Sequence, residues 1–210
     1  MAELEIIGTP FSNYVRSIRM LCEEKGVEYR LNPARPHTPD VTAVHPAGQV
    51  PCMRHGEVAL FESQAIATYI DKAFPGPEFI PGDAIGAAHA VQWVSYCNVK
   101  VDRWIMREFV VPSVFFDKAK GPDTVRIAAA LPEIEKCLAV LESAIAQTGY
   151  LAGGALSFAD MNVLPMLEIF EQYPQGKELL AKHPALLTYV AKLTARPSFT
   201  NTAPPPRPSS

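Results

Sequence analysis

The residues that could do chemistry begin in the segment 8–16, where a short apolar run gives way to a helical pattern. Ser12 stands at or just before the expected helix start, where unpaired backbone N–H groups and the helix dipole favour an anion. A thiolate at this point would be stabilised by the dipole and by a hydrogen bond from the serine hydroxyl. Serine is also a common helix N-cap, so the position alone leaves a purely structural role open.

A second group is Gln49, Val50 and Pro51, directly before an expected strand. A proline in this place can follow a cis peptide bond in a tight turn. The backbone N–H and C=O of Val50 would then face outward and could pair with an extended, peptide-like ligand. A trans proline that opens a strand is the alternative.

A third group is the pair Glu62 and Ser63 at the start of an expected helix, with Ser63 as the expected N-cap. Free N–H donors and a hydroxyl suit a carboxylate, and the neighbouring glutamate suits an ammonium group. Together they would recognise the head group of an amino acid, which carries both charges. Such a pair is also common before helices that bind nothing.

The first 75 residues contain the elements that must position these groups. Periodicity predicts a helix that ends at Gly26, a helix from about residue 63, and strands at 4–7, 27–31, 52–54 and 58–61. The order is β-α-β, a Pro-rich loop, then β-β-α. Residues 76–85 are rich in proline and glycine and are interpreted as a linker.

Residues 86–200 have helical patterns only, and we expect them to form an all-α domain. The expected helices are about 86–116, 123–147, 158–172, 176–182 and 184–194. Residues 157–160 have the form of a capping box that starts the third of them. The Pro-rich tail, 201–210, lacks large apolar side chains and is predicted to be disordered.

Composition excludes several classes of function. The 210 residues are 48% hydrophobic and 20% charged, with a net charge of −3, which argues against an electrostatic nucleic-acid binder. No apolar run approaches the ~20 residues of a membrane span, and no secretory signal is visible. We therefore expect a cytoplasmic protein with neither a nucleic-acid nor a membrane partner.

The four cysteines, Cys22, Cys52, Cys97 and Cys137, are far apart in the sequence. They form neither a C-x-x-C redox pair nor a zinc-ligand spacing. We expect them to be buried, reduced apolar residues, and we expect no metal site.

In combination, these three groups resemble the glutathione transferase family, over about residues 3–200. The resemblance implies a thioredoxin-like α/β domain (1–75) that binds glutathione, followed by the all-α domain (86–200) that holds a second substrate. It also implies that Pro51 is cis. Two-fold homodimers are usual in this family, so a homodimer is expected.

The resemblance also implies roles for individual residues. Glu62 and Ser63 bind the γ-glutamyl end of glutathione, and Val50 pairs with its cysteinyl part. Gln49 reaches the γ-glutamyl or glycyl portion. A basic residue of the preceding loop holds the glycyl carboxylate; His37 is the first candidate and Arg35 the second.

The family divides by the side chain that activates the glutathione thiol. Tyrosine classes carry Tyr on the first strand, which here has no tyrosine, and cysteine classes carry Cys where Ser12 stands. The motif Phe11-Ser12-x-Tyr14-Val15-Arg16 resembles the serine type of the phi, theta and zeta groups, and most of all its bacterial members. Thr9 and Asn13 stay open as alternative donors.

The activity that the resemblance implies is detoxifying conjugation of glutathione to a small hydrophobic electrophile. Ser12 donates to the thiolate, glutathione is the co-substrate, and no metal or tightly bound cofactor takes part. The candidates for lining the substrate cleft are Phe11, Tyr14, Arg107, Phe109 and Val110.

Other functions remain compatible with the same residues. They are glutathione-dependent isomerisation, dehalogenation or peroxide reduction, and non-catalytic binding of glutathione or other ligands. A thiol oxidoreductase fits less well, because position 12 is not cysteine.

Overall fold

The computed structural model describes residues 2–206, which divide into two units. The first unit contains residues 2–82 together with 195–206, and the second, helical unit contains residues 83–194. Among the described residues, no helix combines the length and the apolar character that crossing a membrane requires.

The first unit is built on a four-stranded mixed sheet in the order β2-β1-β3-β4. β1 pairs with β2 in parallel and with β3 in antiparallel orientation, and β3 and β4 form a hairpin. The strands are β1 (Leu4–Ile7), β2 (Arg30–Asn32), β3 (Cys52–His55) and β4 (Val58–Phe61). The predicted thioredoxin-like arrangement, β-α-β followed by β-β-α, is confirmed.

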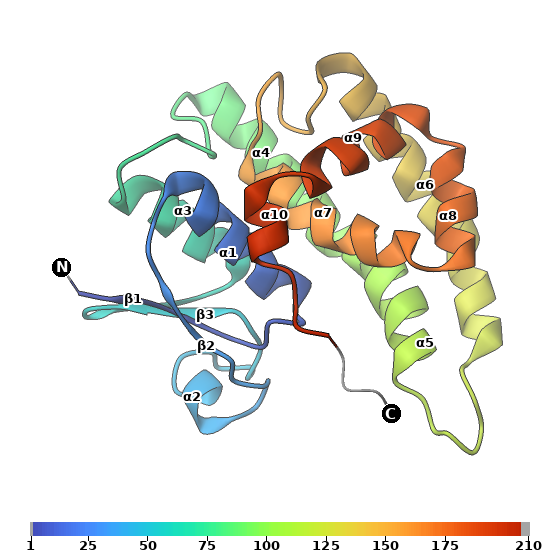
Figure 1. Cartoon of the computed structure of the whole chain (residues 1–210), viewed down its shortest axis with the longest axis horizontal. Helices are drawn as coiled ribbons and strands as arrows, with labels where there is room; N and C mark the ends of the chain where they lie inside the picture. The colour runs from blue at the N-terminus through green and yellow to red at the C-terminus, as the bar shows by residue number, and fades with distance from the viewer. Residues whose placement is uncertain (1, 207–210) are drawn as a thin grey trace. The chain divides into compact units, whose positions relative to one another are not determined.

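Two helices, α1 (Asn13–Lys25) and α3 (Ser63–Ala73), pack side by side on one face of this sheet (Figure 1). α1 buries an apolar stripe that includes Val15, Ile18 and Leu21, at the spacing that puts them on one face. It ends at Gly26, whose left-handed conformation (φ 68°) suits a residue without a side chain. A short helix, α2 (Pro39–Thr42), lies in the Pro-rich loop.

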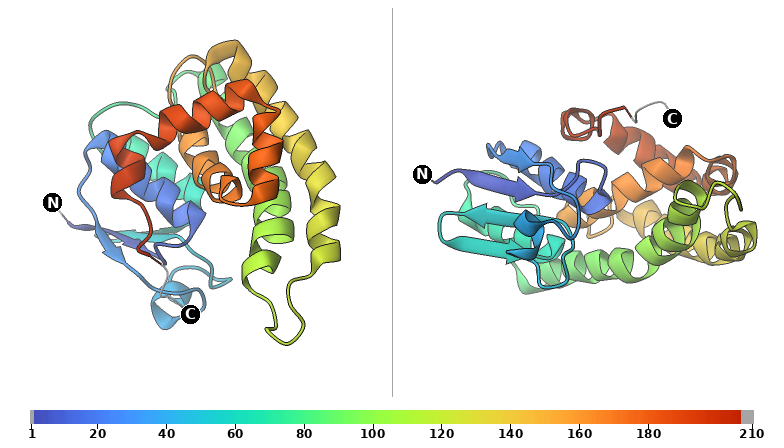
Figure 2. Two further views of the ribbon diagram at one scale, coloured as in Figure 1. Left: turned by 45° about the vertical axis from the view of Figure 1, so that its right-hand side comes forward. Right: turned by 90° about the horizontal axis from the view of Figure 1, so that it is seen from below.

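The helical unit opens with one long continuous helix. It runs as α4 (Ala84–Tyr96), a π-helical stretch η1 (Cys97–Val110) and α5 (Val111–Val114), and α6 (Thr124–Thr148) packs alongside η1 (Figures 1 and 2). The wider π-helical turn explains why Arg107 pairs with Asp102, five residues earlier, at 3.0 Å. The expected helix at 86–116 is confirmed as a helix but not as a regular α-helix.

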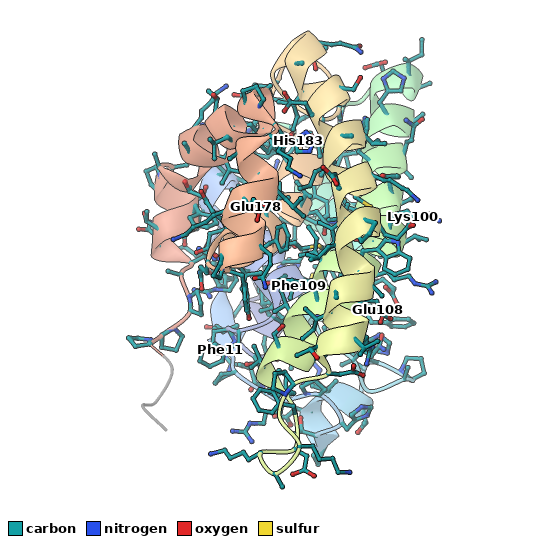
Figure 3. The ribbon with its side chains drawn as sticks, turned by 90° about the vertical axis from the view of Figure 1, so that its right-hand side faces the viewer. Phe11, Lys100, Glu108, Phe109, Glu178 and His183 are labelled. Carbon is teal, nitrogen blue, oxygen red and sulfur yellow. The ribbon has the colours of Figure 1, made fainter. Side chains whose placement is uncertain are left out.

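Three more helices complete this unit: α7 (Phe158–Glu171), α8 (Pro174–Ala181) and α9 (Pro184–Thr194). α7 is buried on almost every side, as expected for a helix that is apolar all round. Phe109 of η1 meets the rings of Phe170 and Tyr173 edge to face at 5.1 and 5.2 Å. Figure 3 shows Phe109 inside the unit and its neighbour Glu108 toward the surface.

The predicted capping box at the start of α7 is confirmed. Asp160 accepts hydrogen bonds from the N–H and the hydroxyl of Ser157, both at 2.8 Å. It also accepts from the N–H of Leu151 and from the hydroxyl of Tyr189, again at 2.8 Å. The carboxylate is fully buried, so these donors replace the water that it loses.

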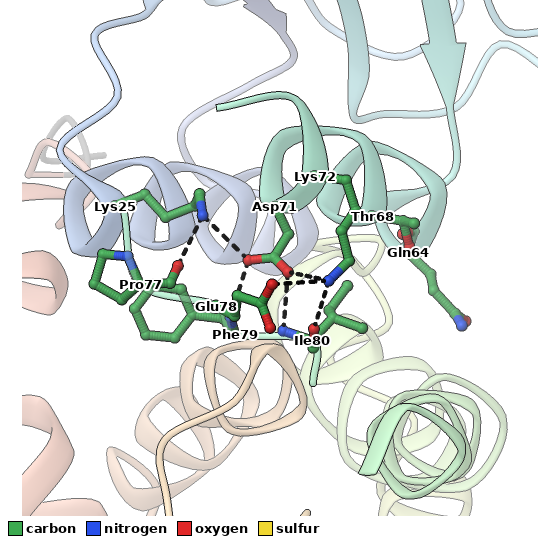
Figure 4. Close-up of polar contacts among 9 residues, drawn as sticks. All are labelled: Lys25, Gln64, Thr68, Asp71, Lys72, Pro77, Glu78, Phe79 and Ile80. Atoms are coloured by element: carbon green, nitrogen blue, oxygen red, sulfur yellow. Dashed lines mark hydrogen bonds and ion pairs between the residues drawn. The ribbon is translucent and has the colours of Figure 1, made fainter. Parts of the chain in front are cut away.

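A buried ion pair fixes the chain where it leaves α3 (Figure 4). Lys25 pairs with Asp71 at 3.4 Å, and both side chains are at most 1% exposed. Asp71 also accepts from the N–H groups of Phe79 and Ile80, and Lys25 donates to the carbonyl of Pro77. The segment 77–80 is therefore bound to both α1 and α3.

The end of the described chain returns to the first unit. α10 (Pro197–Asn201) packs on α1, and Arg196 binds Glu24 through two hydrogen bonds of 2.6 Å. The expected boundary at residue 200 therefore differs from the structure, in which residues 195–206 belong with the sheet. In the expected disordered tail, Thr202 is fully buried, and residues 207–210 lie outside the described residues.

Candidate glutathione-binding site

The strand register brings the predicted site residues to one edge of the sheet. Ile7 of β1 lies opposite Cys52 of β3, and Cys52 lies opposite Phe61 of β4. The ends of β1, β2 and β4 and the start of β3 therefore share an edge. Four segments leave this edge: residues 8–12, 33–38, 49–51 and 62–63.

Ser12 is the N-cap of α1, as predicted. Its hydroxyl oxygen accepts a hydrogen bond of 3.4 Å from the N–H of Val15, and the side chain is half-buried. A hydroxyl that accepts in this way still has its own O–H to donate. Of the alternative donors, the Thr9 hydroxyl accepts from the N–H of Phe11 at 3.4 Å, and Asn13 is the first residue of the helix.

Gly8 allows the first βα junction to lie close to the third segment. A Cβ atom at Gly8 would lie 2.5 Å from Cγ2 of Val15, which would have to move, and 3.0 Å from Cβ of Val50, which is a tight contact. Because Gly8 has no side chain, the start of α1, which carries Ser12, can lie close to Val50.

The bond between Val50 and Pro51 is cis, as the resemblance implied. This turn packs on a small apolar core made by Ile7, Val41 and Cys52, with the side chain of Val50 at its border. Gln49 is exposed, and its carbonyl accepts from the thiol of Cys52 at 3.5 Å.

His37 has a left-handed backbone (φ 63°), and its N–H donates to the carbonyl of Gly48 at 2.8 Å. A Cβ atom at Gly48 would collide with the imidazole of His37. The missing side chain of Gly48 therefore lets the ring of His37 approach the turn that carries Gln49 and Val50. Arg35, the second candidate, is also exposed on this loop.

Glu62, rather than Ser63, is the N-cap residue of α3. Glu62 has φ 67° and makes no capping hydrogen bond through its side chain, whereas Ser63 is the first helical residue and is 5% exposed. The backbone N–H groups of the first turn of α3 thus open at this edge, beside a carboxylate whose side chain is 67% exposed.

Sequence reasoning missed His45, which lies next to Glu62 in the structure. Its Nε2 lies 3.7 Å from Oε1 of Glu62, and its ring lies against that of Phe61 with the centroids 4.7 Å apart. The residue is 4% exposed. Seventeen positions separate it from Glu62, so no local pattern could connect the two.

All four cysteines are free and buried, as predicted. Burial raises the pKa of Cys22 to about 12 and that of Cys52 to about 11, and it also raises the pKa values of Cys97 and Cys137. A thiol with a raised pKa is a poor nucleophile at neutral pH. None of these thiols is a candidate for the reacting group.

The five predicted substrate contacts are divided between the units. Phe11 is 45% exposed and Tyr14 is half-buried at the start of α1. In the helical unit, the Arg107 side chain is 60% exposed and pairs with Asp102. Phe109 and Val110 are 1% and 3% exposed, so they belong to the core of the fold and offer almost no surface to a substrate.

The arrangement can bind an elongated ligand with charged ends. A hydroxyl at a helix start suits a thiolate, an exposed carboxylate beside a second helix start suits an amino-acid head group, and His37 suits a second carboxylate. Among residues 2–206, no group of three or more His, Cys, Asp and Glu side chains is placed to hold a metal ion.

The described residues thus form a two-domain protein, in which a thioredoxin-like sheet unit is combined with an all-helical unit. The sequence matches the glutathione S-transferase N-terminal domain over residues 6–78 and the glutathione S-transferase C-terminal domain over residues 124–192. The chain belongs to the glutathione S-transferase superfamily.

Individual relatives agree with this assignment. Glutathione S-transferase 3 of Zea mays is 29% identical, covering 100% of this chain and 99% of its own. Glutathione S-transferase I from mais, in complex with an atrazine glutathione conjugate, is 25% identical with a TM-score of 0.85, covering 96% of this chain and 97% of its own. The theta class glutathione S-transferase of Xanthomonas axonopodis pv. citri, with glutathione bound, is 27% identical with a TM-score of 0.82. The match covers 97% of this chain and 98% of its own.

Proposed function

We propose that this protein is a glutathione transferase that joins the sulfur of glutathione to a small hydrophobic electrophile. The observation that carries the proposal is the common sheet edge, where the N-cap hydroxyl of Ser12 and the start of α3 at Glu62 and Ser63 lie together. Membership of the superfamily supports the same reaction.

Ser12 activates the thiol by donating a hydrogen bond to the thiolate. A free thiol has a pKa near 8.5, so only a few per cent is ionised at neutral pH. Lowering this pKa by two units takes about 2.7 kcal/mol. A hydrogen bond to a charged group supplies about 1.5–3 kcal/mol, and the dipole of α1 adds about 0.3–1 kcal/mol.

The activated sulfur then attacks an electrophilic carbon. A new S–C bond forms with the electron pair of the thiolate, and the leaving group departs with the electrons of the broken bond. Where the substrate is an activated alkene, the second carbon takes up a proton instead. Ser12 keeps its own proton throughout and is not the nucleophile.

The rest of glutathione lies along the same edge in this proposal. The N–H groups and hydroxyl at Ser63 bind the γ-glutamyl carboxylate, and Glu62 binds the ammonium group. The backbone of Val50, before cis Pro51, pairs with the cysteinyl part. Gln49 and His37, with Arg35 as the alternative to His37, reach the glycyl end.

We place the protein in the serine type, with the phi, theta and zeta groups, because Ser12 occupies the helix start. Phe11 and Tyr14 are the proposed contacts of the electrophile in the first unit, whereas Arg107 keeps its ion pair with Asp102 on the helical unit. Phe109 and Val110 support η1 from inside the core and act only through it.

The proposal is tested by measuring the pKa of the bound glutathione thiol from thiolate absorbance against pH. The wild-type protein is compared with Ser12→Ala, and with Thr9→Val and Asn13→Ala as matched variants of the alternative donors. We expect a bound thiol pKa about two units below 8.5 in the wild type, returning toward 8.5 only in Ser12→Ala.

The other outcomes are equally informative. Loss of the shift in Thr9→Val or Asn13→Ala, but not in Ser12→Ala, would move the donor role to that residue. Binding of glutathione with an unshifted pKa in all four proteins would contradict the transferase mechanism.

We also propose a cytoplasmic homodimer, since members of this family are usually two-fold dimers. The outward face of α3 is available for an interface: it lines a hollow of about 840 Å³ that runs from Glu62 past Thr68 to Ala73. This hollow is not the expected thiol site, because its lining does not include Ser12. Light scattering should give twice the 23.0 kDa of the chain, and a monomer at micromolar concentration would contradict the proposal.

A further inference from the structure

His45 is a buried polar residue to which the proposed reaction assigns no task. Its backbone closes the loop before Pro51, since its N–H donates to the carbonyl of Val41 at 2.8 Å and its carbonyl accepts from Gly48 at 2.9 Å. Its imidazole has a separate set of contacts, with Ala47, Phe61 and Glu62. The side chain is only 6% exposed, so these contacts are made away from bulk water.

The hydrogen bonds of the ring determine which nitrogen carries the proton. Nδ1 accepts from the N–H of Ala47 at 3.1 Å, and an accepting nitrogen carries no hydrogen. In the neutral imidazole the proton is therefore on Nε2. Nε2 is also the atom that faces Oε1 of Glu62, at 3.7 Å, so the ring presents its N–H toward the carboxylate.

Glu62 needs such a partner because little else fixes its side chain. Its backbone has φ 67°, a conformation that residues with a Cβ rarely adopt, and the side chain is 67% exposed. An exposed glutamate samples many rotamers, and a carboxylate restricted to one direction binds an ammonium group at a lower entropic cost.

We propose that His45 is a positioning residue that aims the Glu62 carboxylate at the ammonium group of the γ-glutamyl end of glutathione. The ring of Phe61 holds the imidazole from one side, Ala47 fixes its tautomer, and Nε2–H directs Oε1 of Glu62. The inference rests on the proposed function, because it concerns the same ligand.

Two substitutions of His45 test the roles of its two ring nitrogens separately. In His45→Asn the amide oxygen takes the place of Nδ1 and can still accept from Ala47, as asparagine does in turns, but nothing reaches Glu62. In His45→Gln the longer side chain brings an N–H group toward Glu62 and gives up the contact with Ala47. His89→Asn, on the exposed face of α4, is the matched control.

The experiment measures the dissociation constants of glutathione and of its analogue without the γ-glutamyl amino group, by calorimetry. We expect His45→Asn to weaken glutathione binding by about fivefold, the upper range for one exposed charge contact, and to leave the analogue unaffected. His45→Gln should restore most of the glutathione affinity, and in Glu62→Gln protein the His45→Asn change should have no further effect.

Each contrary result has a separate meaning. Equal losses for glutathione and the analogue would show that His45 only supports the loop, and unchanged binding in His45→Asn would remove it from the site; either result overturns the inference and leaves the proposed function standing. Failure of the wild-type protein to bind glutathione would overturn the proposed function, and the inference with it.

Discussion

At the scale of single residues, backbone strain coincides with the candidate site. Among the described residues, the non-glycine positions with positive φ are His37 and Glu62, and both were singled out in the sequence as ligand contacts. Such conformations persist only where the surroundings impose them. His37 is held by the hydrogen bond from its N–H to the carbonyl of Gly48, and Glu62 lies where β4 passes into α3. The site is therefore shaped before a ligand arrives.

Gly48→Ala should weaken glutathione binding through His37. The new Cβ would collide with the imidazole, and a non-glycine residue at φ 66° is itself strained by about 1 kcal/mol. Calorimetry should show a loss of affinity for glutathione and a smaller loss for γ-glutamylcysteine, which lacks the glycyl carboxylate.

Gly121→Ala is the control for this change. Gly121 has a similar φ of 72°, but a Cβ there meets nothing within 4 Å. Gly121→Ala should therefore lower the stability by a similar amount and leave the affinity for glutathione unchanged. If Gly48→Ala lowered the affinities for glutathione and γ-glutamylcysteine equally, His37 would not be the residue that binds the glycyl carboxylate.

At the scale of elements, α7 depends on the one carboxylate at its start. Asp160 is fully buried and accepts hydrogen bonds from Ser157, Leu151 and Tyr189. Burial, the largest effect, raises the pKa of Asp160 although these bonds act in the opposite direction. Because the folded pKa lies above the unfolded one, this group favours folding at low pH, and the contribution is lost as pH rises through the raised pKa.

Asp160→Ala should destabilise the protein by about 3 kcal/mol or more, because it leaves buried donors without an acceptor. Urea unfolding measures the change. Asp123→Ala is the comparison, since Asp123 caps α6 at the exposed surface through a single bond to the N–H of Arg126, and its loss should cost about 1 kcal/mol. Similar costs for the two variants would contradict the role given to burial.

The sequence predicted those elements whose signals are local. Strand 4–7 ends at Gly8, strand 58–61 follows a turn that contains Gly56, and the capping box at 157–160 is a short-range pattern. The helices α2 and α10 were missed because four or five residues that start with proline carry no periodicity, and α10 owes its place to contacts with α1. β2 forms at Arg30–Asn32 rather than at 27–31, because pairing with β1 decides its register.

The site was predictable where a residue type and a helix start coincide. Ser12, Glu62 and Ser63 could be identified in this way, whereas the backbone of Glu62 and the approach of His45 depend on how distant segments fold together. For Phe109, the sequence pointed to the wrong kind of site. A large apolar residue is equally suited to a cleft and to a core, and only packing against Phe170 decides between them.

At the scale of the whole molecule, the first unit is completed by residues from both ends of the described chain. Glu24 on α1 binds Arg196 through two hydrogen bonds, 172 residues apart in sequence. Burial raises the pKa of Glu24, but the bonds from Arg196 and Ser198 and the charge of Arg196 together lower it below its usual value. This contact therefore stabilises the fold above the unfolded pKa of about 4.3, and the contribution is lost as pH falls through the folded pKa.

Glu24→Gln should lower the free energy of unfolding by about 2 kcal/mol at pH 7, the range for hydrogen bonds to a charged group. Hydrogen exchange at residues 197–202 should accelerate, and the difference from the wild type should shrink at acidic pH. Glu23→Gln is the control, since Glu23 is exposed and accepts a hydrogen bond from the amide of Asn201; it should change stability by less than about 0.5 kcal/mol.

The burial of the four thiols has a consequence for an enzyme with this proposed task. A protein that handles electrophiles is exposed to alkylation by its own substrates. With a pKa of about 11, roughly one Cys52 side chain in ten thousand is ionised at pH 7. The pKa of Cys22 is about 12, so its ionised fraction is smaller still. The bound glutathione would then carry the reactive sulfur, and the catalyst would be spared damage from the compounds that it removes.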